Sequence, residues 1–320
     1  AFTLIKNFIR QFFWLTKHFK KADAVYCWFS DYHGFLPVLF ARIFNKPMIT
    51  VLGGFDCNKF QELGYGIFCS SWRAPLGTYI LRNSTLLLPV DEYLIATSEK
   101  SKHWGEAHPN GVKNNLSNFI TPWEALPTGY ASQDWEAGPN HREKIVSTVA
   151  LVSNQRTALI KGWDLFIEVA KLKPDFEFII AGISPDFTDQ FIKQYSPPPN
   201  LQFIPPQPRE NLSEIYQKTS VYLQLSRAEG LPNVLCEAML CGCVSVGSPV
   251  FGIPDAIGDA GFVAEKPDPE EIAKLVEMAH SQAETLRIKA RKRIIEKFSI
   301  QQRKQRLKAV LHPYLNSVNK

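Results

Sequence analysis

The stretch SRAEGLPNVLCEAMLCG, from Ser226 to Gly242, joins a polar loop to an apolar helix. The preceding SVYLQLS is rich in apolar and β-branched residues and predicts a buried strand. Pro232 suits the first turn of a helix, where its missing N–H is not needed. Gly242 is typical of the position that follows the last helical turn. The stretch therefore predicts a strand that turns through a short loop into a helix.

The rest of the chain alternates between buried strands and helices. Strands are predicted at residues 23–29, 47–54, 145–153, 176–184, 201–206 and 243–250, and the alternation continues through 85–98 and 119–130. Helices are predicted at residues 34–46, 163–173, 209–219 and from 269 onward. This pattern indicates parallel sheets covered by helices on both faces. Two such series in tandem predict two doubly wound, Rossmann-type α/β domains, whose ligands bind at the carboxyl ends of the strands.

A polar segment at residues 131–144 lies between the two series and indicates an inter-domain linker. The length of 320 residues also favours two domains, because single cores stop growing at about 250–300 residues. We therefore predict a first domain at 1–140, a second at 141–298, and a final helix at 299–320 that crosses back to the first.

The composition is that of a globular protein, with 45% hydrophobic and 21% charged residues. The net charge of +5 is too weak to indicate nucleic acid, but it suits anionic ligands or an anionic membrane surface. None of the six cysteines forms a C-x2-C pair, which argues against zinc and favours a reducing cytoplasm.

Residues 2–19 place apolar side chains at helical spacing with basic residues between them. They predict either an amphipathic helix packed on a sheet or one that also touches anionic lipid. No signal peptide or membrane span is visible, so the expected location is cytoplasmic, with peripheral contact at the inner membrane face.

Two acidic residues accompany the helix that follows Pro232. The amides of residues 229–234 point out of a helix N-terminus, which is an anion site suited to a diphosphate. Glu237, inside the helix, can accept hydrogen bonds from two neighbouring hydroxyls, as a ribose presents them. Glu229 lies in the loop, so it is expected to be closer than Glu237 to the group that is attached to the bound phosphate. The alternatives are that Glu229 is a helix-start acid and that Glu237 pairs with a local cation.

This stretch resembles the Glu-x(7)-Glu signature of retaining glycosyltransferases with the GT-B fold, the group 1 or family 4-like enzymes. The resemblance runs from about Asp23 to the final helix and is most specific over Ser226–Val263. It implies two domains facing across a cleft, an acceptor-side domain followed by a nucleotide-sugar domain. It implies that Glu229 contacts the donor sugar or its phosphate and that Glu237 binds the donor ribose. The other donor-binding residues that we expect are Gly230, Leu231, Pro232, Asn233, Val234, Gly252 and Asp255.

Family members usually carry a strand, a glycine-rich loop and further β-α units before the segment that matches residues 23–29. Those units are missing here, so the resemblance predicts a truncated first domain. Gly252 and Pro254 turn the chain sharply before Asp255, where the family usually has glutamate. The alternative for Asp255 is an N-cap of a short helix.

Lys161 and Gly162 precede a predicted helix, and Arg156 lies five residues before Lys161. In the family, an arginine and a lysine at this turn neutralise the departing nucleoside diphosphate, where fixed cations stabilise developing charge. The resemblance therefore implies catalytic roles for Lys161 and Arg156 beside Glu229. The alternative is a pair of surface cations.

Four residues after the strands of the first domain are candidates for the acceptor side: His33, Gly53, Gly54 and Asp56. The histidine that the family often carries after the second of these strands is absent, and His33 and Asp56 are substitutes by position. Structural roles remain the alternative for all four residues. No Asp-x-Asp motif occurs, and the acids of PDPEE (267–271) are typical of a helix start.

The predicted function is metal-independent transfer of a sugar from a nucleotide-diphosphate donor, with retention, to a hydroxyl of a lipid-linked saccharide or cell-surface glycan. No cofactor is expected. The alternatives are a catalytically weak donor-binding or scaffolding fragment, or a nucleotide-sugar epimerase of the same fold. A phosphorylase would need a lysine-bound pyridoxal phosphate, and an NAD enzyme would need G-x-G-x-x-G after a strand, and neither motif is visible.

Overall fold

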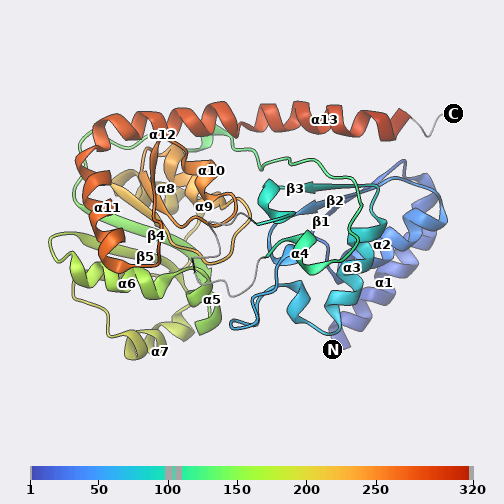
Figure 1. Cartoon of the computed structure of the whole chain (residues 1–320), viewed down its shortest axis with the longest axis horizontal. Helices are drawn as coiled ribbons and strands as arrows, with labels where there is room; N and C mark the ends of the chain where they lie inside the picture. The colour runs from blue at the N-terminus through green and yellow to red at the C-terminus, as the bar shows by residue number, and fades with distance from the viewer. Residues whose placement is uncertain (1, 98–103, 105–109, 317–320) are drawn as a thin grey trace. The chain divides into compact units, whose positions relative to one another are not determined.

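The computed structural model describes residues 2–97, 104 and 110–316, which form two compact units. The first unit runs over residues up to 97, 110–127 and from 303 onward, and the second includes residues 128–302. Each unit contains one parallel sheet, which confirms the predicted fold class (Figure 1).

The first unit is built on a three-stranded sheet of order β1-β2-β3. Its strands are β1 (Val25–Trp28), β2 (Met48–Leu52) and β3 (Leu86–Pro89). Its helices are α1 (Phe2–His18), α2 (Tyr32–Ile43), α3 (Arg73–Asn83), the short α4 (Val112–Asn115) and most of α13 (Ile300–Asn316), with short 3-10 turns at Phe19–Lys21, Phe55–Cys57, Ile67–Cys69 and Glu92–Leu94. All residues of β2 and β3 are buried, as expected for strands covered on both faces.

The predicted continuation of the strand pattern through residues 119–130 is wrong. Trp123 makes a single parallel bridge to Leu87. A few isolated backbone hydrogen bonds join the segment to β3, such as that from Leu87 N to Pro122 O at 2.9 Å, but they do not form a continuous ladder. The segment contains Pro122 and Pro127, which have no backbone N–H to donate to a ladder. This explains why an apolar segment beside β3 does not become a strand.

The start of α13 is anchored within the first unit. Arg303 donates a hydrogen bond to Leu126 O at 2.8 Å and another to Pro127 O. Its guanidinium also lies 5.4 Å from the ring centre of Trp28, in cation–π contact. The side of β1 that carries Trp28 is thereby partly covered by α13.

The second unit is built on a six-stranded sheet of order β6-β5-β4-β7-β8-β9. Its strands are β4 (Ile145–Val152), β5 (Glu177–Ile183), β6 (Leu201–Ile204), β7 (Val221–Gln224), β8 (Val244–Gly247) and β9 (Gly261–Val263). Its helices are α5 (Gln155–Ile160), α6 (Trp163–Leu172), α7 (Pro185–Tyr195), α8 (Arg209–Lys218), α9 (Asn233–Leu240), α10 (Ile253–Ile257), α11 (Pro269–Ser281) and α12 (Ala283–Lys297), with a 3-10 turn at Ser132–Asp134.

The helices of this unit divide between the two faces of the sheet. The chain moves from β4 outward to β6 in one direction and from β7 to β9 in the other, so right-handed crossovers place their helices on opposite faces. Accordingly, α6 contacts α11, whereas α9 contacts α8 and α12 (Figure 1). Central strands β7 and β8 are fully buried as a result.

The polar segment at 131–144 packs onto the second unit. Trp135 is 1% exposed and lies against the ring of Tyr216, and Arg142 is 5% exposed. The sequence pattern of this segment gave no sign of these buried contacts. By contrast, Asp268 caps α11 as expected for a helix-start acid, accepting a hydrogen bond from Glu270 N at 3.0 Å.

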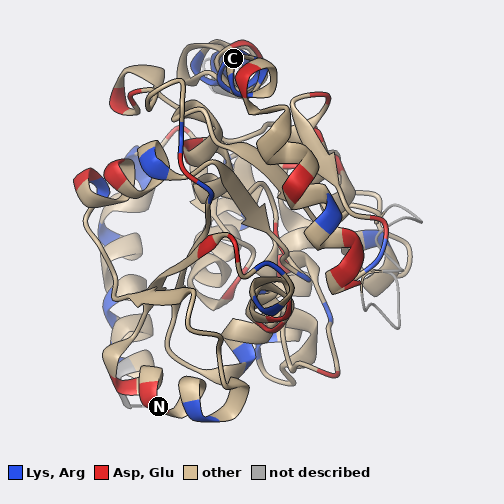
Figure 2. Ribbon diagram, turned by 90° about the vertical axis from the view of Figure 1, so that its left-hand side faces the viewer, with Lys and Arg blue, Asp and Glu red and all other residues tan. Residues whose placement is uncertain are grey.

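Lys and Arg residues and Asp and Glu residues are both spread over many elements of the chain (Figure 2). Both signs occur on α11 and α12, whereas α1 and α13 carry basic residues and no acidic ones. Within the described ranges, no helix is long and apolar enough to cross a bilayer. All six cysteines are free, and all except Cys69 are buried, where they act as small apolar side chains.

Candidate functional site

Three loops meet at the carboxyl edge of the second sheet. They follow β4, β7 and β8, which are neighbours and run parallel, so their carboxyl ends share one edge. The loops lead to Lys161, Glu229 and Gly252. Gly252 N donates to Gly230 O at 2.9 Å, which ties the third loop to the second.

Gly162 brings the first loop against the end of β7. Its φ of +71° is left-handed, and a Cβ at this position would lie 2.0 Å from Leu225 O. Only glycine combines this backbone conformation with this close approach. The close contact places Lys161, the residue that ends α5, beside the loop that carries Glu229.

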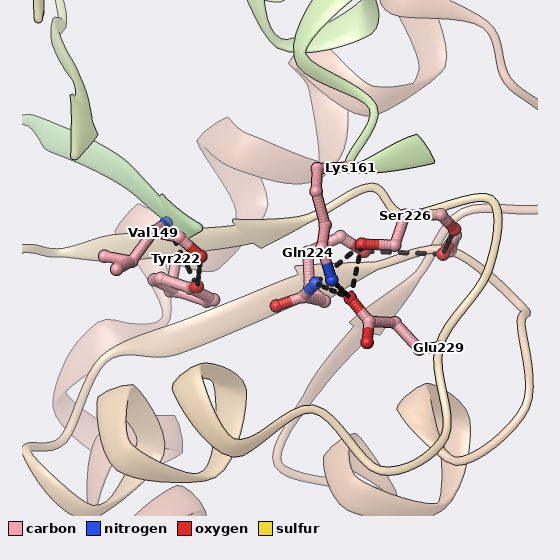
Figure 3. A network of polar contacts seen from close by, with 7 residues as sticks. Val149, Lys161, Tyr222, Gln224, Ser226 and Glu229 are labelled. Carbon is pink, nitrogen blue, oxygen red and sulfur yellow. Dashed lines mark hydrogen bonds and ion pairs between the residues drawn. The ribbon is translucent and has the colours of Figure 1, made fainter. Parts of the chain in front are cut away.

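Lys161 and Glu229 form an ion pair, with 2.5 Å between Lys161 Nζ and Glu229 Oε1 (Figure 3). The same oxygen accepts hydrogen bonds from Ser226 Oγ at 3.0 Å and from Gln224 Nε2 at 3.3 Å. The Lys161 side chain is 27% exposed and that of Glu229 is 12% exposed. Glu229 is thus held by three donors through one oxygen, and its Oε2 has no partner among the residues described.

Ser226 and Gln224 support Glu229, and neither was predicted as a site residue. Gln224 Nε2 donates to Ser226 Oγ at 2.8 Å, and Ser248 Oγ donates to Ser226 O at 2.7 Å. Gln224 is 3% exposed, and its Oε1 is buried without a hydrogen-bond partner in the described structure. The only available signal was the placement of Gln224 and Ser226 at the end of a buried strand.

The loop from Gly230 leads directly into α9. Pro232 is the N-cap of this helix, and Asn233 is its first residue, which confirms the predicted helix after the loop. Asn233 Oδ1 accepts a hydrogen bond from Tyr130 OH at 2.9 Å, and Tyr130 OH contacts Thr128 Oγ1 at 2.7 Å. Gly242 follows the C-cap with φ +82°, as the sequence pattern predicted.

Glu237 lies one helical turn beyond Asn233, so both side chains project from the same face of α9. It is half-buried, and within the described ranges its carboxylate has neither a hydrogen bond nor an ion pair. Burial raises the pKa of Glu237 to about 6, with the positive charge of Arg209 acting in the opposite direction. An unpaired carboxylate in this position is able to accept hydrogen bonds from a ligand.

Asp255 and Arg156 lie outside the contacts of Figure 3. Asp255 is in the first turn of α10, whose N-cap is Gly252, and its 59% exposed side chain lies 3.8 Å from Arg293 Nη2. Arg156 is exposed near the start of α5. Of the two predicted cations, Lys161 is therefore the one in direct contact with Glu229.

In the first unit, Asp56 holds two loops together. It is fully buried and accepts hydrogen bonds from the amides of Ser30 at 3.0 Å, Gly53 at 3.0 Å and Gly54 at 2.9 Å. Burial raises the pKa of Asp56, and these amide hydrogen bonds oppose that rise. Its carboxylate has no exposed oxygen to offer a ligand in this conformation.

His33 and Gly53 also have close structural partners. His33 Nε2 lies 2.7 Å from Trp28 O, and its ring meets that of Tyr32 edge to face. A Cβ on Gly53 would lie 2.3 Å from the ring of Phe29. These residues shape the loops after β1 and β2.

An ion pair that was not predicted lies at the same edge of the first sheet. Arg73 Nε donates to Asp31 Oδ1 at 2.9 Å, and the guanidinium lies 4.7 Å from the ring centre of Phe55. Burial would raise the pKa of Asp31, but hydrogen bonds from Arg73 and the Tyr32 amide lower it overall. Trp72, beside this pair, is 50% exposed.

The described residues contain no group of three or more His, Cys, Asp or Glu side chains arranged to hold a metal ion.

A sequence model of the glycosyl transferases group 1 family matches residues 137–298, just over half of the chain. The chain is 28% identical over 202 residues to the GPI3 subunit of phosphatidylinositol N-acetylglucosaminyltransferase from Saccharomyces cerevisiae, covering 61% of this chain and 42% of that protein. It is 26% identical over 208 residues to N-acetyl-alpha-D-glucosaminyl L-malate synthase from Bacillus anthracis, covering 62% and 53%. The matches thus span about half or less of these curated relatives.

Among solved structures, the chain is similar to sucrose-phosphate synthase from Thermosynechococcus elongatus, with a TM-score of 0.73, 15% identity, and coverage of 95% of this chain and 77% of that chain. It is also similar to HepE from Anabaena in complex with UDP and glucose, with a TM-score of 0.67, 13% identity, and coverage of 93% and 80%. These likenesses confirm the predicted GT-B fold. Because the family match covers more than half of the chain and the fold agrees with it, the chain belongs to the glycosyl transferases group 1 family.

Proposed function

We propose that this chain binds a nucleotide-diphosphate sugar on its second unit and transfers the sugar, with retention, to an acceptor hydroxyl. The observation that supports this most directly is the Lys161–Glu229 ion pair beside the start of α9. A cation, a helix N-terminus and the unpaired carboxylate of Glu237 match the diphosphate, its charge and the ribose of such a donor. HepE was solved with UDP-glucose, so UDP-sugars are the first donors to test.

The proposal gives each residue a separate role. Lys161 and Arg156 neutralise the diphosphate as it departs, together with the backbone N–H groups of Gly230, Leu231, Asn233 and Val234. Gly252 keeps the loop after β8 close to Gly230, so backbone surrounds the diphosphate. In the donor complex, Lys161 turns from Glu229 to the diphosphate, and Glu229 accepts hydrogen bonds from the sugar.

The reaction needs no protein nucleophile in this proposal. The acceptor oxygen attacks the anomeric carbon on the face from which the diphosphate leaves, and the bond between that carbon and the diphosphate oxygen breaks. The acceptor proton passes to the departing diphosphate. Stabilising the leaving charge is then the main contribution of the protein.

Titration calorimetry with UDP and GDP, run beside a donor-turnover assay, tests the proposal. We expect a nucleotide to bind to the second unit and its sugar conjugate to be consumed in the presence of an acceptor. Binding without turnover would favour a donor-binding or scaffolding role. Absence of nucleotide binding would contradict the proposal as a whole.

The nucleotide affinity of Glu237→Ala is expected to be about tenfold to a hundredfold weaker. One hydrogen bond to a charged group contributes about 1.5–3 kcal/mol, and the loss of one such bond to the ribose corresponds to this range. Because the pKa of Glu237 is raised to about 6, its carboxylate is ionised at pH 7.5 and largely protonated at pH 5.5. Affinity should therefore fall as the pH falls through this window, which calorimetry at both pH values measures.

Glu237→Gln is the control for this pH effect, because its amide does not titrate. The ligand phosphate also titrates near pH 6, so the difference in slope between wild type and Glu237→Gln is the diagnostic quantity. Equal slopes, or an unchanged affinity in Glu237→Ala, would remove Glu237 from the ribose site.

We assign acceptor recognition to the first unit, at the loops after β1 and β2. The exposed ring of Trp72 offers an apolar face for a sugar ring, and Arg73 offers charged donors beside it. His33, Gly53 and Gly54 shape the same loops. The acceptor class that we propose is a lipid-linked saccharide or a cell-surface glycan.

We further propose that α1 rests on an anionic membrane surface. Ile5, Ile9, Phe12 and Phe13 form an exposed apolar stripe on this helix, and Phe13 is 66% exposed. The basic side chains of Lys6, Arg10 and Lys17 are also exposed on α1, and no acidic residue occurs before Asp23. Apolar and basic stripes side by side on one helix suit an interface between water and anionic lipid.

Phe13→Ser is expected to lower partitioning onto phosphatidylglycerol-containing vesicles by roughly tenfold, since burying a Phe side chain contributes about 1.5–3 kcal/mol. Cosedimentation measures this change. Ile43→Ser is the matched control, because Ile43 is also 66% exposed but lies on α2. Equal partitioning of the two variants, or equal binding to neutral vesicles, would contradict this role for α1.

A further inference from the structure

A cavity lies at the amino edge of the second sheet, opposite the edge that carries Glu229. It has a volume of about 320 Å³, at the lower end of the range for small-molecule sites. Its lining includes Arg142 and Gly242, which precede β4 and β8. Because all strands of the sheet are parallel, their amino ends lie on the edge away from the Lys161–Glu229 pair. The cavity is therefore separate from the proposed donor site.

Three arginines line this cavity: Arg142, Arg287 and Arg291. Arg142 is 5% exposed and Arg287 is 7% exposed. Within the described ranges, no carboxylate lies within 4.0 Å of any of the three guanidinium groups. Their partners are backbone carbonyls and one thiol. Arg142 donates to the carbonyls of Pro139, Tyr216, Thr219 and Cys241 and to Cys243 Sγ. Arg287 donates to the carbonyls of Ala283, Pro139 and Asn140, and Arg291 donates to those of Ser132, Trp135 and Leu240.

These carbonyls offset only part of the positive charge. Two helix ends contribute, those of α8 and α9, and each carries about half a negative charge. Together they balance about one of the three guanidinium charges, which leaves roughly two positive charges. Burial lowers the pKa of Arg287, and the positive charge of Arg142 lowers it further. The wall of the cavity thus carries a net positive charge of about two, which is not balanced by the protein.

The cavity also offers donors that are still available. Arg287 Nη2 and Arg291 Nε have no acceptor among the described atoms, although the other nitrogens of both groups donate to carbonyls. Lys292 and Glu296 also line the cavity, lie 3.7 Å apart and are 69% and 57% exposed. Their opposite charges cancel, so this pair does not change the charge balance of the wall. Ile288 and Ile295 line the same cavity and offer apolar contact.

We propose that this cavity binds a phosphate monoester dianion, with the phosphate on Arg287, Arg291 and Lys292 and its organic substituent against Ile288 and Ile295. Two negative charges match the charge that the wall lacks, and guanidinium groups bind phosphate through paired donors. Both a soluble phosphorylated metabolite and a phosphomonoester lipid headgroup carry this chemistry.

Calorimetry with sn-glycerol 3-phosphate as the probe tests the proposal in the whole chain. We expect binding at one site, no heat with glycerol, and about tenfold weaker binding for Lys292→Glu and for Ile288→Glu. Both residues are exposed, so these variants should keep the fold. Lys289→Glu is the matched control, because Lys289 lies on the same helix, is 51% exposed and pairs with Asp259 outside the cavity.

Retention of wild-type affinity in Lys292→Glu, or equal losses in Lys289→Glu, would overturn the proposal. Loss of glycerol 3-phosphate binding in Lys161→Ala would also overturn it, because the probe would then occupy the proposed donor site. Dioctanoyl phosphatidic acid serves as the lipid arm. If dioctanoyl phosphatidic acid binds at least tenfold more tightly than glycerol 3-phosphate, and Lys292→Glu weakens the binding of both probes equally, the natural ligand is a lipid. If the two probes bind with equal affinity, the natural ligand is a soluble metabolite.

Discussion

Lys161→Ala is expected to lower the turnover of the sugar donor by about 10²–10³-fold. Removing one group that stabilises charge in a transition state typically has an effect of this size. The Lys161 side chain is 27% exposed, so its truncation leaves no sealed cavity and the fold should be kept. The measurement is kcat at saturating donor, together with circular dichroism to show that the fold is unchanged.

Lys171→Ala is the control for this experiment. Lys171 Nζ lies 2.8 Å from a Glu168 oxygen on the surface of α6, so it forms the same kind of pair away from the carboxyl edge. Turnover by Lys171→Ala should stay close to that of wild type. If the two variants turn over donor at similar rates, the ion pair with Glu229 is structural and Lys161 has no role in catalysis.

Gly162→Ala is expected to destabilise the second unit by about 3 kcal/mol or more. A left-handed backbone costs a non-glycine residue about 1–2 kcal/mol. The new methyl group would also lie 2.0 Å from Leu225 O, so the loop or the end of β7 must move. Urea unfolding followed by circular dichroism measures the loss in stability. Nucleotide affinity should fall as well, because Lys161 is the adjacent residue.

Gly64→Ala separates the two contributions. Gly64 also has a left-handed φ, +57°, but a Cβ there would meet nothing within 4 Å. This variant should therefore lose only the backbone contribution, about 1–2 kcal/mol. Equal losses at Gly64 and Gly162 would show that the loop after β4 relaxes freely away from β7.

The strands and most helices of the second unit follow from local sequence. The buried runs at 145–153, 176–184 and 243–250 became β4, β5 and β8, because apolar β-branched segments between helices have few other stable arrangements. The helices α5 and α7 were not predicted. The helix α5 is only six residues long and is fixed by its Asn154 cap and its contact with α6. Such short helices carry too little periodicity to be identified from sequence.

The roles of polar residues in the first unit were harder to anticipate. Asp56 follows a strand, as a ligand-binding residue does, yet the fold buries it fully against three amides. Arg73 and Asp31 are 42 residues apart and pair across the same edge. Both outcomes depend on which loops lie side by side, and that information is absent from any single segment.

The sequence by itself determined the strand that ends just before Ser226, the loop that follows it and the helix that follows the loop. It also determined that the surrounding sheets are parallel. It could do so because turn residues and the spacing of apolar side chains act over a few positions. Only the tertiary structure decided that Lys161 meets Glu229, 68 residues further along the chain. The sheet order places β4 beside β7, and Gly162 lets their loops touch, so strand pairing and close packing created that contact.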